Sequence, residues 1–251
     1  MQAHLFMVEI THEVVSTGGD VDEPCVGYGT DGHLYSLKRL EDGPLIPATE
    51  WVCHSLSRAV GIPTPDFLPV KRQVNGDIAF ATRIDPTNER IVSPHTAGAE
   101  PLEIQIVRYF TQSVVQHSQL YGLDAAIGNT TRGWRSFVFR RTPYGVVPLA
   151  QNFRRAWVAE ETPFGEIPWQ PLAGSAAMMR YLYSLDVFDA AEARATVDRL
   201  YALSNTAIQD ALNTCHPSWV QNHNWQPTLD LWSRRQQHLK PLALQNFSAM
   251  P

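Results

Sequence analysis

The chain has 251 residues, of which 44% are hydrophobic and 18% are charged. This composition excludes wholesale disorder, and no apolar run approaches the roughly 20 residues that a membrane-spanning helix requires. The formal net charge of −5 gives no general attraction to nucleic acid. We therefore expect a soluble globular protein that does not act on nucleic acid or in a membrane, with room for one large domain or two lobes.

The N-terminal segment has no basic start followed by an apolar run and a small-residue cleavage site, so the sequence predicts no secretory signal and a cytoplasmic location. The three cysteines, Cys25, Cys53 and Cys215, are widely separated. They form no CxxC pair, and no histidine stands at zinc-ligand spacing from them. We expect them to be buried thiols.

The first part of the chain has the pattern of strands. Residues 5–15 are rich in β-branched and apolar side chains and predict a strand, and residues 77–85 predict another. Between them, two short alternating runs surround Thr30-Asp31-Gly32, an Asp-Gly turn that predicts a hairpin. Helical spacing of apolar residues predicts a helix over 47–60 that ends at Gly61.

The second part of the chain has the pattern of helices. We predict one long amphipathic helix over 101–123, and helices over the segments 172–185, 189–203, 205–215 and 228–239. Asp189 and Glu192 have the spacing of a capping box. Residues 241–251 are predicted to be a loosely docked tail. The change from strands to helices predicts a strand-rich part over 1–90 and a helical part over 91–251.

The stretch Leu123–Trp157 predicts the end of a helix, a tight polar loop, a strand pair and a second polar loop. Loops held in this way on rigid elements are where kinases place the groups that handle a metal-bound nucleotide. The positions in these loops that would then be acidic are not acidic. This conflict is the main functional information in the sequence.

Three features of the first part occur in the order that kinases use. They are a loop with Gly18 and Gly19, then Lys38 at the end of a strand, then Glu50 in the first turn of the next helix. In kinases such a lysine and glutamate form an ion pair that grips phosphates. Taken singly, Lys38 is better explained as a solvated lysine at the end of a strand. Glu50 is explained equally well as a residue that favours the helix dipole.

In this order the pieces resemble the HipA-like kinase family, the bacterial Ser/Thr kinases that include toxin components of toxin–antitoxin pairs. The resemblance covers roughly residues 8–240 and rests on four segments: DGHLYSLK, TEWVCHSLSRAVGIPTPD, LDAAIGNTTRGWRSFVF and NFRRAW. It implies an α+β, bilobal protein-kinase-like fold with a smaller strand-rich lobe and a helical lobe. An active family member would use ATP and Mg²⁺. For this chain no cofactor is assigned, and ATP and Mg²⁺ are expected only if binding or activity is retained.

Carried over by the resemblance, the family's catalytic Asp falls on Thr131, its metal-binding Asn on Ser136 and its metal-binding Asp on Asn152. The residues Asn129, Arg132 and the structural Asp124 are retained. Threonine cannot act as a base near neutral pH, and Mg²⁺ prefers charged oxygen ligands. The resemblance therefore implies a degenerate site with weak or no metal binding.

The Gly-Gly loop departs from the family pattern as well. In the resemblance this loop covers the phosphates, whose charge is favoured by backbone N–H groups. Here Asp20, Asp22 and Glu23 come after the glycines and would stand close to the anion. Like charges a few ångströms apart oppose each other by about 1 kcal/mol or more, so this loop is poorly suited to ATP.

The sequence supports three hypotheses. The first is a pseudokinase that acts by binding a protein partner. The second is an active, atypical Ser/Thr kinase in which Asp124, Asp31 or an acid of the Gly-Gly loop replaces the missing carboxylates. The third is a non-kinase interaction domain, in which Trp134 is an exposed recognition tip rather than a core side chain. We also predict a basic patch that meets an acidic protein segment, formed by Arg140, Arg141, Arg154 and Arg155.

Overall fold

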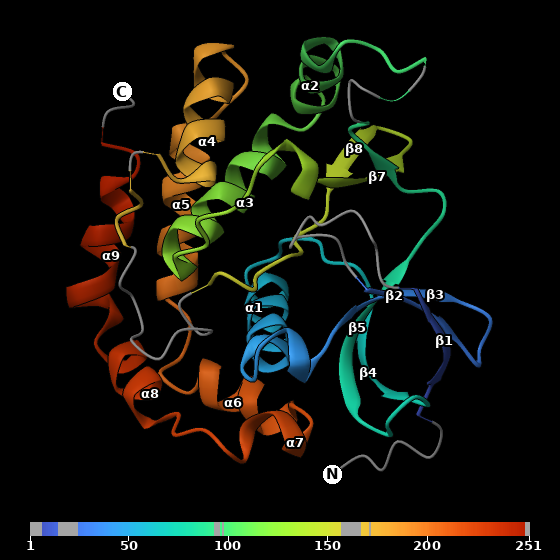
Figure 1. Cartoon of the computed structure of the whole chain (residues 1–251). Coiled ribbons are helices and arrows are strands. Elements are labelled where there is room, and N and C mark those ends of the chain that lie inside the picture. The colour runs from blue at the N-terminus through green and yellow to red at the C-terminus, as the bar shows by residue number, and fades with distance from the viewer. Residues whose placement is uncertain are drawn as a thin grey trace.

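The computed structural model describes residues 7–14, 25–92, 96, 98–156, 167–170 and 172–248. Strands of the first part form a small closed barrel, and the second part of the chain is mainly helical (Figure 1). The predicted succession of strands and then helices is confirmed. Gly18, Gly19 and the acids after them lie outside the described residues, so the structure gives no account of the Gly-Gly loop.

The barrel contains β1 (Glu9–Val14), β2 (Cys25–Gly29), β3 (Leu34–Lys38), β4 (Phe67–Arg72) and β5 (Ile78–Ile84), in the order β1-β2-β3-β5-β4. Neighbouring strands are antiparallel except β1 and β4, whose parallel pairing of Ile10 with Arg72 closes the barrel. Alternate residues along the strands point inward. They fill the barrel with Ile10, Cys25, Tyr35, Leu37, Val70, Ala79 and Ala81.

The turn between β2 and β3 is the predicted hairpin. Gly32 has a φ of +79°, which is the left-handed conformation that glycine adopts without strain. The Asp31 carboxylate accepts hydrogen bonds from the His33 N–H (3.2 Å) and the Tyr35 hydroxyl (2.6 Å). Local chemistry therefore determines this turn, as the sequence indicated.

Helix α1 (Ile46–Ala59) comes after β3 and the short 3₁₀ helix η1 (Leu40–Asp42), and it confirms the helix predicted over 47–60. Because α1 begins at Ile46 and has no acidic residue in its first turn, the expectation that Glu50 lies in that turn is wrong. It lies between the barrel and the other helices (Figure 1). Its buried side chains Val52, Cys53 and Leu56 belong to the larger hydrophobic core rather than to the barrel interior. The division of the chain at residue 90 stays a prediction, but α1 clearly ties both parts together.

A second sheet, of order β6-β7-β8, links the end of the barrel segment to the central stretch. It contains β6 (Glu89–Arg90), β7 (Val138–Thr142) and β8 (Gly145–Pro148). The antiparallel pair β7 and β8 is the strand pair predicted within Leu123–Trp157. Strand β6 was not predicted, because two residues carry no periodic pattern.

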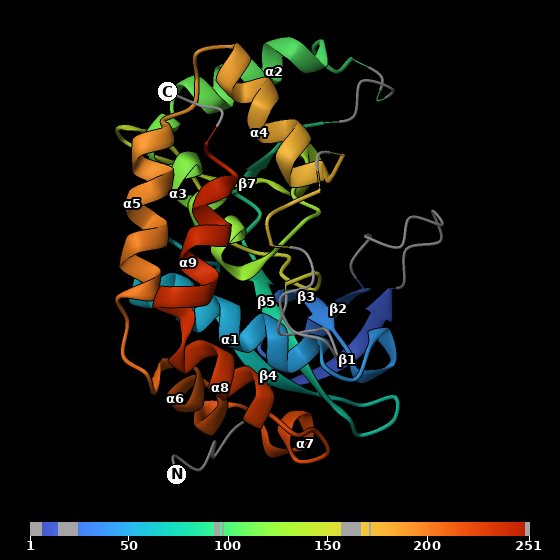
Figure 2. The same ribbon diagram turned by 90° about the vertical axis from the view of Figure 1, so that its left-hand side faces the viewer.

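The helical part begins with α2 (Leu102–Thr111), α3 (Val114–Ile127) and the 3₁₀ helix η2 (Trp134–Ser136). It continues with α4 (Gly174–Ser184), α5 (Ala190–Tyr201), α6 (Ala207–Thr214), α7 (Pro217–Val220), α8 (Gln226–Ser233) and α9 (Arg235–Gln245). Helices α3, α5 and α9 pack against one another, and Figure 2 shows α5 and α9 side by side. The Asp189 carboxylate caps α5 by accepting from the N–H groups of Ala191 and Glu192. The reciprocal half of the predicted capping box does not form, because the Asp189 N–H donates to the Ser118 hydroxyl instead.

The prediction of one long helix over 101–123 is wrong, because the chain breaks into α2 and α3 at Gln112 and Ser113. The Ser113 hydroxyl donates to the Tyr109 carbonyl at 2.9 Å, and its N–H donates to the Phe110 carbonyl at 3.1 Å. A serine side chain that bonds nearby backbone in this way competes with the helix. The apolar periodicity continues across the break and conceals it.

Two expectations for the end of the chain are also wrong. The helix predicted over 228–239 is divided at Arg234 into α8 and α9. The predicted loose tail is helical to Gln245 and packed beyond it, since Phe247 is fully buried and its carbonyl accepts from the Arg194 guanidinium at 2.6 Å. Residues 249–251 lie outside the described part. Burial of one large aromatic side chain explains why this segment is docked.

The three cysteines are buried and form no disulfide, as predicted. No helix within the described ranges combines the length and the apolar character that crossing a bilayer requires.

The contact between α3 and α5 depends on Gly122, where an added Cβ would lie 2.2 Å from the Ala193 carbonyl oxygen. We predict that Gly122→Ala lowers the free energy of unfolding by about 1–3 kcal/mol, although alanine is the better helix former. Urea denaturation measures this. Gly133→Ala is the control, because nothing lies within 4 Å of its added Cβ. Equal effects of the two substitutions would show that α3 and α5 do not depend on this close approach.

Candidate functional site

The centre of the site is a buried ion pair at the end of α3. Asp124 and Arg132 are both almost completely inaccessible to solvent. The Arg132 Nε donates to one Asp124 carboxylate oxygen, and its Nη2 donates to the other at 3.0 Å. The Asn129 side-chain amide donates to the same carboxylate at 2.9 Å. Helix α3 ends at Gly128 in the left-handed conformation (φ 67°), which turns the chain back over Asp124.

The environment of this pair is apolar and its polar atoms are incompletely satisfied. Burial raises the pKa of Asp124, and the charge and hydrogen bonds of Arg132 oppose that shift. The Arg132 guanidinium lies 5.8 Å from the Phe137 ring centroid and 5.5 Å from that of Phe153. Arg132 Nη1 and Asn129 Oδ1 are buried without a hydrogen-bond partner in the described part of the chain. The pair is therefore a costly arrangement that holds only while both partners are present.

Ser175, in the first turn of α4, fixes the loop from the other side. Its hydroxyl donates to the Asn129 carbonyl at 2.7 Å and accepts from the Arg132 N–H at 2.9 Å. Its own N–H donates to the Thr130 carbonyl at 3.0 Å. Sequence reasoning missed Ser175, because nothing in its local sequence marks a partner more than forty residues away.

The two polar loops of the central stretch meet at Asn129 and Asn152. The Asn129 amide nitrogen lies 3.4 Å from the Asn152 carbonyl oxygen. Asn152 itself has a φ of +62°, a left-handed conformation that asparagine tolerates better than most residues. The next residue, Phe153, donates its N–H to the Glu50 carboxylate at 2.9 Å. Helix α1 and both loops are thus joined at one place.

Glu50 is fully buried, and burial raises its pKa while the charge of Lys38 and the Phe153 N–H oppose the shift. His54 Nδ1 lies 3.6 Å from the Glu50 carboxylate, but burial lowers the pKa of His54 to about 3, so this histidine is neutral. Lys38 and Glu50 do not approach within the 4.0 Å of an ion pair. The structure therefore uses Glu50 to hold the Phe153 backbone rather than to bind Lys38 directly.

Only neutral side-chain oxygens stand at the three positions to which the resemblance carried catalytic and metal-binding groups. Thr131 is exposed, and Ser136 and Asn152 are half-buried. Within the described ranges no group of three or more His, Cys, Asp or Glu side chains is placed to hold a metal ion. Asp124 is engaged with Arg132, and Asp31 is engaged with Tyr35 on the hairpin turn. Asp124 is fully buried and is therefore not available to a ligand, whereas Asp31 lies exposed on the turn between β2 and β3.

A small cavity of about 140 Å³ lies where the barrel, the segment before β6 and the second loop meet. Its lining combines the apolar residues Pro65, Ile84, Pro86 and Val138 with polar and charged ones, namely Ser36, Thr82, Arg83, Asp85, Asn88, Arg90 and Gln151. Small-molecule sites usually have volumes of about 300–1,000 Å³ and mostly apolar walls. This cavity, as bounded by the described residues, does not have the character of a purine site.

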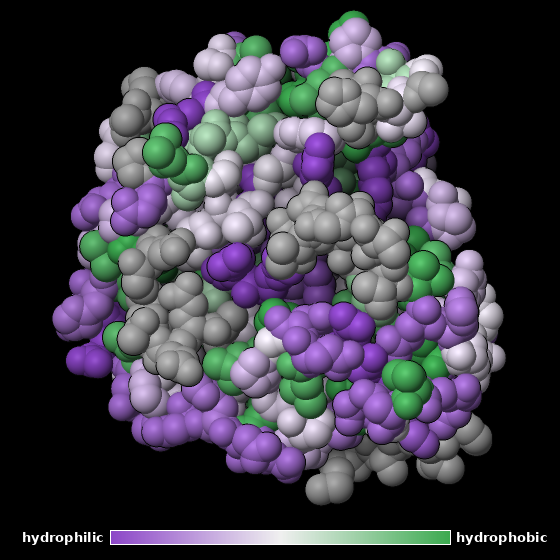
Figure 3. Space-filling view, in the orientation of Figure 1, coloured by the Kyte–Doolittle hydropathy of each residue, from purple (hydrophilic) through white to green (hydrophobic). Residues whose placement is uncertain are grey.

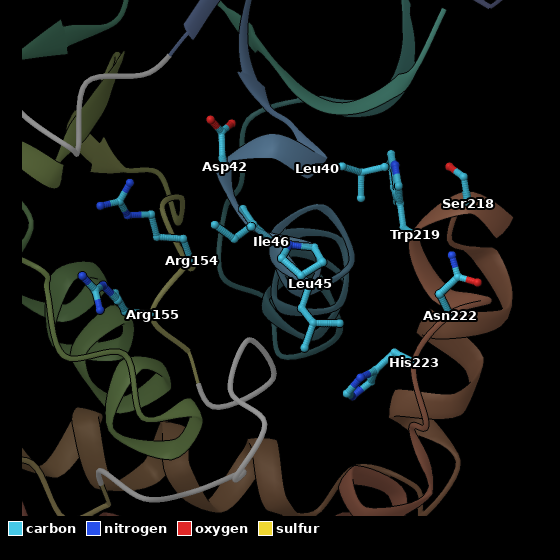
Figure 4. Close-up of a pocket in the computed structure, with 12 residues that line it drawn as sticks. Leu40, Asp42, Leu45, Ile46, Arg154, Arg155, Ser218, Trp219, Asn222 and His223 are labelled. Carbon is cyan, nitrogen blue, oxygen red and sulfur yellow. The ribbon is translucent and has the colours of Figure 1, made fainter.

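A pocket of about 660 Å³ lies at the N-terminal end of α1 (Figure 4). Arg154 and Arg155 line it, while Arg141 pairs with Glu89 on the second sheet, so the four arginines predicted as one patch do not share this pocket. In the face shown in Figure 3, hydrophilic side chains gather over the middle of the molecule. Trp134 is half-buried against the larger core, with the Arg135 guanidinium 4.8 Å from its ring, which favours the packing role over an exposed tip.

No family model and no curated protein matches the chain. Solved structures that are similar to it include HipA, CtkA and the Golgi casein kinase. HipA of Shewanella oneidensis MR-1, in a toxin–antitoxin complex with HipB and operator DNA, has 10% identity and a TM-score of 0.45 over 88% of this chain and 58% of HipA. The Helicobacter pylori proinflammatory kinase CtkA has 10% identity and a TM-score of 0.44 over 98% and 97%. The Golgi casein kinase has 12% identity and a TM-score of 0.47 over 97% and 73%.

The chain spans 58% of the length of the HipA chain that it matches. Because all three TM-scores are below 0.5, these similarities carry no argument about this chain. Its chemistry is inferred from its own residues and their geometry.

The buried pair makes a sharp stability prediction. Asp124→Ala leaves the Arg132 guanidinium buried and unpaired, and we expect the free energy of unfolding to fall by about 3–5 kcal/mol. The double variant Asp124→Ala/Arg132→Met removes the buried charge and is expected to lose less. Urea denaturation at neutral pH compares the two. A double variant that is no more stable than the single one would contradict the assignment of this cost to an unpaired charge.

Glu50 makes a prediction about pH. Its ordinary pKa is 4.5, and in the folded chain it is higher. As the pH rises above 4.5, the Glu50 carboxyl loses its proton in the unfolded chain before it does so in the folded chain. The folded state then binds more protons than the unfolded state, so its stability falls as the pH rises. The fall ends once the pH has passed the pKa of Glu50 in the folded chain. Glu50→Gln keeps an acceptor for the Phe153 N–H without a charge.

We therefore expect the stability of Glu50→Gln relative to the unmodified chain to increase as the pH is raised from 4.5 and to be constant below it. Urea denaturation at a series of pH values measures the difference. Glu50→Ala, which also removes the acceptor, should show the same pH trend with lower stability throughout. A difference between Glu50→Gln and the unmodified chain that does not change with pH would refute the raised pKa.

Proposed function

We propose that this chain is a pseudokinase with a bilobal, HipA-like kinase fold, which acts by binding a protein partner and does not transfer phosphate. In this proposal the barrel is the smaller lobe and the helices from α2 onward form the larger one. Lys38 ends the third strand, Glu50 lies on the next helix, and the two polar loops come after α3 and β8. This is the order in which kinases arrange the corresponding parts.

The observation that carries the proposal is the chemistry of three positions. Phosphoryl transfer relies on a carboxylate that orients the nucleophile and on carboxylate and amide oxygens that hold Mg²⁺ against the phosphates. Thr131, Ser136 and Asn152 present a hydroxyl, a hydroxyl and an amide in their place. The residues present therefore do not fit a magnesium–ATP complex.

The nearby buried carboxylates do not compensate for this loss. Asp124 is held by Arg132 and Asn129, and Glu50 is held by the Phe153 N–H. Both side chains are fully buried, and burial raises the pKa of each. Their bonds hold the loops in place, which is a structural role that survives when phosphate chemistry is lost.

An active atypical kinase would need a substitute carboxylate. Asp124 is buried and held by Arg132, and Asp31 lies on the hairpin turn of the barrel. The remaining nominees, Asp20, Asp22 and Glu23, lie outside the described residues. The association with toxin–antitoxin pairs comes from the resemblance alone and carries no part of this proposal. A non-kinase interaction domain differs from it in having no preserved catalytic frame.

Thermal unfolding with ATP tests the proposal, because a ligand that binds only the folded state raises the melting temperature. We expect no rise that depends on Mg²⁺. The triple variant Thr131→Asp/Ser136→Asn/Asn152→Asp returns the family's groups to the frame, and aspartate tolerates the left-handed backbone at position 152. We expect this variant to gain a Mg²⁺-dependent rise with ATP.

Adding Lys38→Ala to the triple variant is the control and should abolish the gain. A Mg²⁺-dependent rise in the unmodified chain would contradict the pseudokinase. A triple variant that folds but shows no Mg²⁺-dependent rise would mean that other positions also differ from those of an ATP-binding kinase. That result would favour a non-kinase interaction domain.

A further inference from the structure

The 660 Å³ pocket at the start of α1 lies outside the catalytic frame and is built from three separate segments (Figure 4). Its floor is the first turn of α1 with Leu45 and Ile46. Arg154 and Arg155, from the second polar loop, stand on one side. The opposite side comes from α7 and the residues after it, namely Ser218, Trp219, Asn222 and His223.

The electrostatics of this pocket favour an anion. Helix α1 has 14 residues, no acidic side chain in its first turn and no side-chain cap, so its partial positive charge is not neutralised from within the helix. Arg154 and Arg155 add to it. Asp42 is the one acidic residue among the described lining, and its carboxylate is taken by Arg39, at 2.7 Å from the guanidinium and 2.8 Å from the N–H.

The pocket also offers apolar surface beside its charges. Leu40, Leu45, Ile46 and Trp219 line it. Its volume falls within the range of about 300–1,000 Å³ that is usual for ligand sites. A matching ligand therefore carries a negative charge and an apolar side chain close together. A nucleic-acid strand does not fit this description well, since the chain as a whole is acidic with a net charge of −5.

We propose that this pocket docks an acidic, partly apolar peptide segment of a protein partner, with a carboxylate against Arg155 and an apolar side chain against Leu40 and Ile46. The inference rests on the proposed function only for the statement that the occupant belongs to a protein partner. The pocket itself supplies the chemistry of that occupant. Charge complementarity and the apolar floor select the occupant.

An occupant of this pocket would touch three segments of the chain: the second polar loop, the start of α1, and α7 with the residues after it. Arg154 directly succeeds Phe153, whose N–H is bound by Glu50 of α1. The indole of Trp219 donates to the Ile78 carbonyl of β5 at 2.9 Å, so α7 is anchored to the barrel. Binding therefore bridges the second polar loop, α1 and α7, and should stabilise the folded chain.

Fluorescence anisotropy with labelled peptides tests the proposal. The probes are peptides in which leucine or phenylalanine is flanked by glutamates, matched peptides with lysine in place of glutamate, and polyglutamate of the same length. We expect the acidic, apolar peptides to bind and to raise the melting temperature. The lysine peptides should not bind, and polyglutamate should bind more weakly.

Two exposed residues allow substitution without disturbing the core. We expect Arg155→Glu and Asn222→Glu, on opposite sides of the pocket, each to weaken binding by about tenfold or more. Arg140→Glu is the matched control, since Arg140 is an exposed arginine on β7 outside the pocket, and should leave the affinity unchanged.

Failure of every acidic, apolar peptide to bind would overturn the proposal, as would equal losses for Arg140→Glu and Arg155→Glu. Equal affinity of polyglutamate, or tighter binding of a single-stranded oligonucleotide, would replace it with a general attraction between charges. The assay contains neither nucleotide nor metal. Its outcome is therefore independent of whether the chain transfers phosphate.

Discussion

The buried pair of Asp124 and Arg132 is the interaction on which the central stretch depends. Placing two charges in an apolar interior is costly, and the cost is offset only when each charge has its partner and its hydrogen bonds. By engaging Asn129 as well, the pair fixes the first polar loop, and Asn129 then reaches the backbone of Asn152 in the second. Ser175 closes the arrangement from α4. Positions that face solvent on such a rigid frame can change without loss of the fold.

Under the proposed function, Glu50 also holds the backbone in place rather than taking part in phosphate binding. On the corresponding helix of a kinase, a glutamate binds the lysine that contacts phosphates. Here its carboxylate accepts the Phe153 N–H, and Lys38 influences it only through its charge. Together with Asp124 it gives the interior two acids that position the backbone. In the proposed pseudokinase, the acids that would face a metal are absent at Thr131 and Asn152, and the polar groups that remain are those that hold the loops.

Local chemistry explains which parts of the fold could be predicted from the sequence. The turn at Asp31 and the cap at Asp189 depend on side chains that bond backbone within three residues, and both were visible. The helix break at Ser113, the docking of Phe247 and the role of Ser175 depend on contacts that periodicity cannot reveal. In the same way, the sequence suggested arginines near the loops, but only the structure shows which of them face the pocket at the start of α1.

The central claim, that the catalytic frame persists without phosphate chemistry, is tested most directly by transfer of radiolabelled γ-phosphate from ATP. The purified chain is incubated with Mg²⁺ or Mn²⁺, and label on the protein and release of phosphate are both measured. The account predicts no more of either than with the Lys38→Ala variant. Robust phosphate transfer that Lys38→Ala abolishes would contradict it.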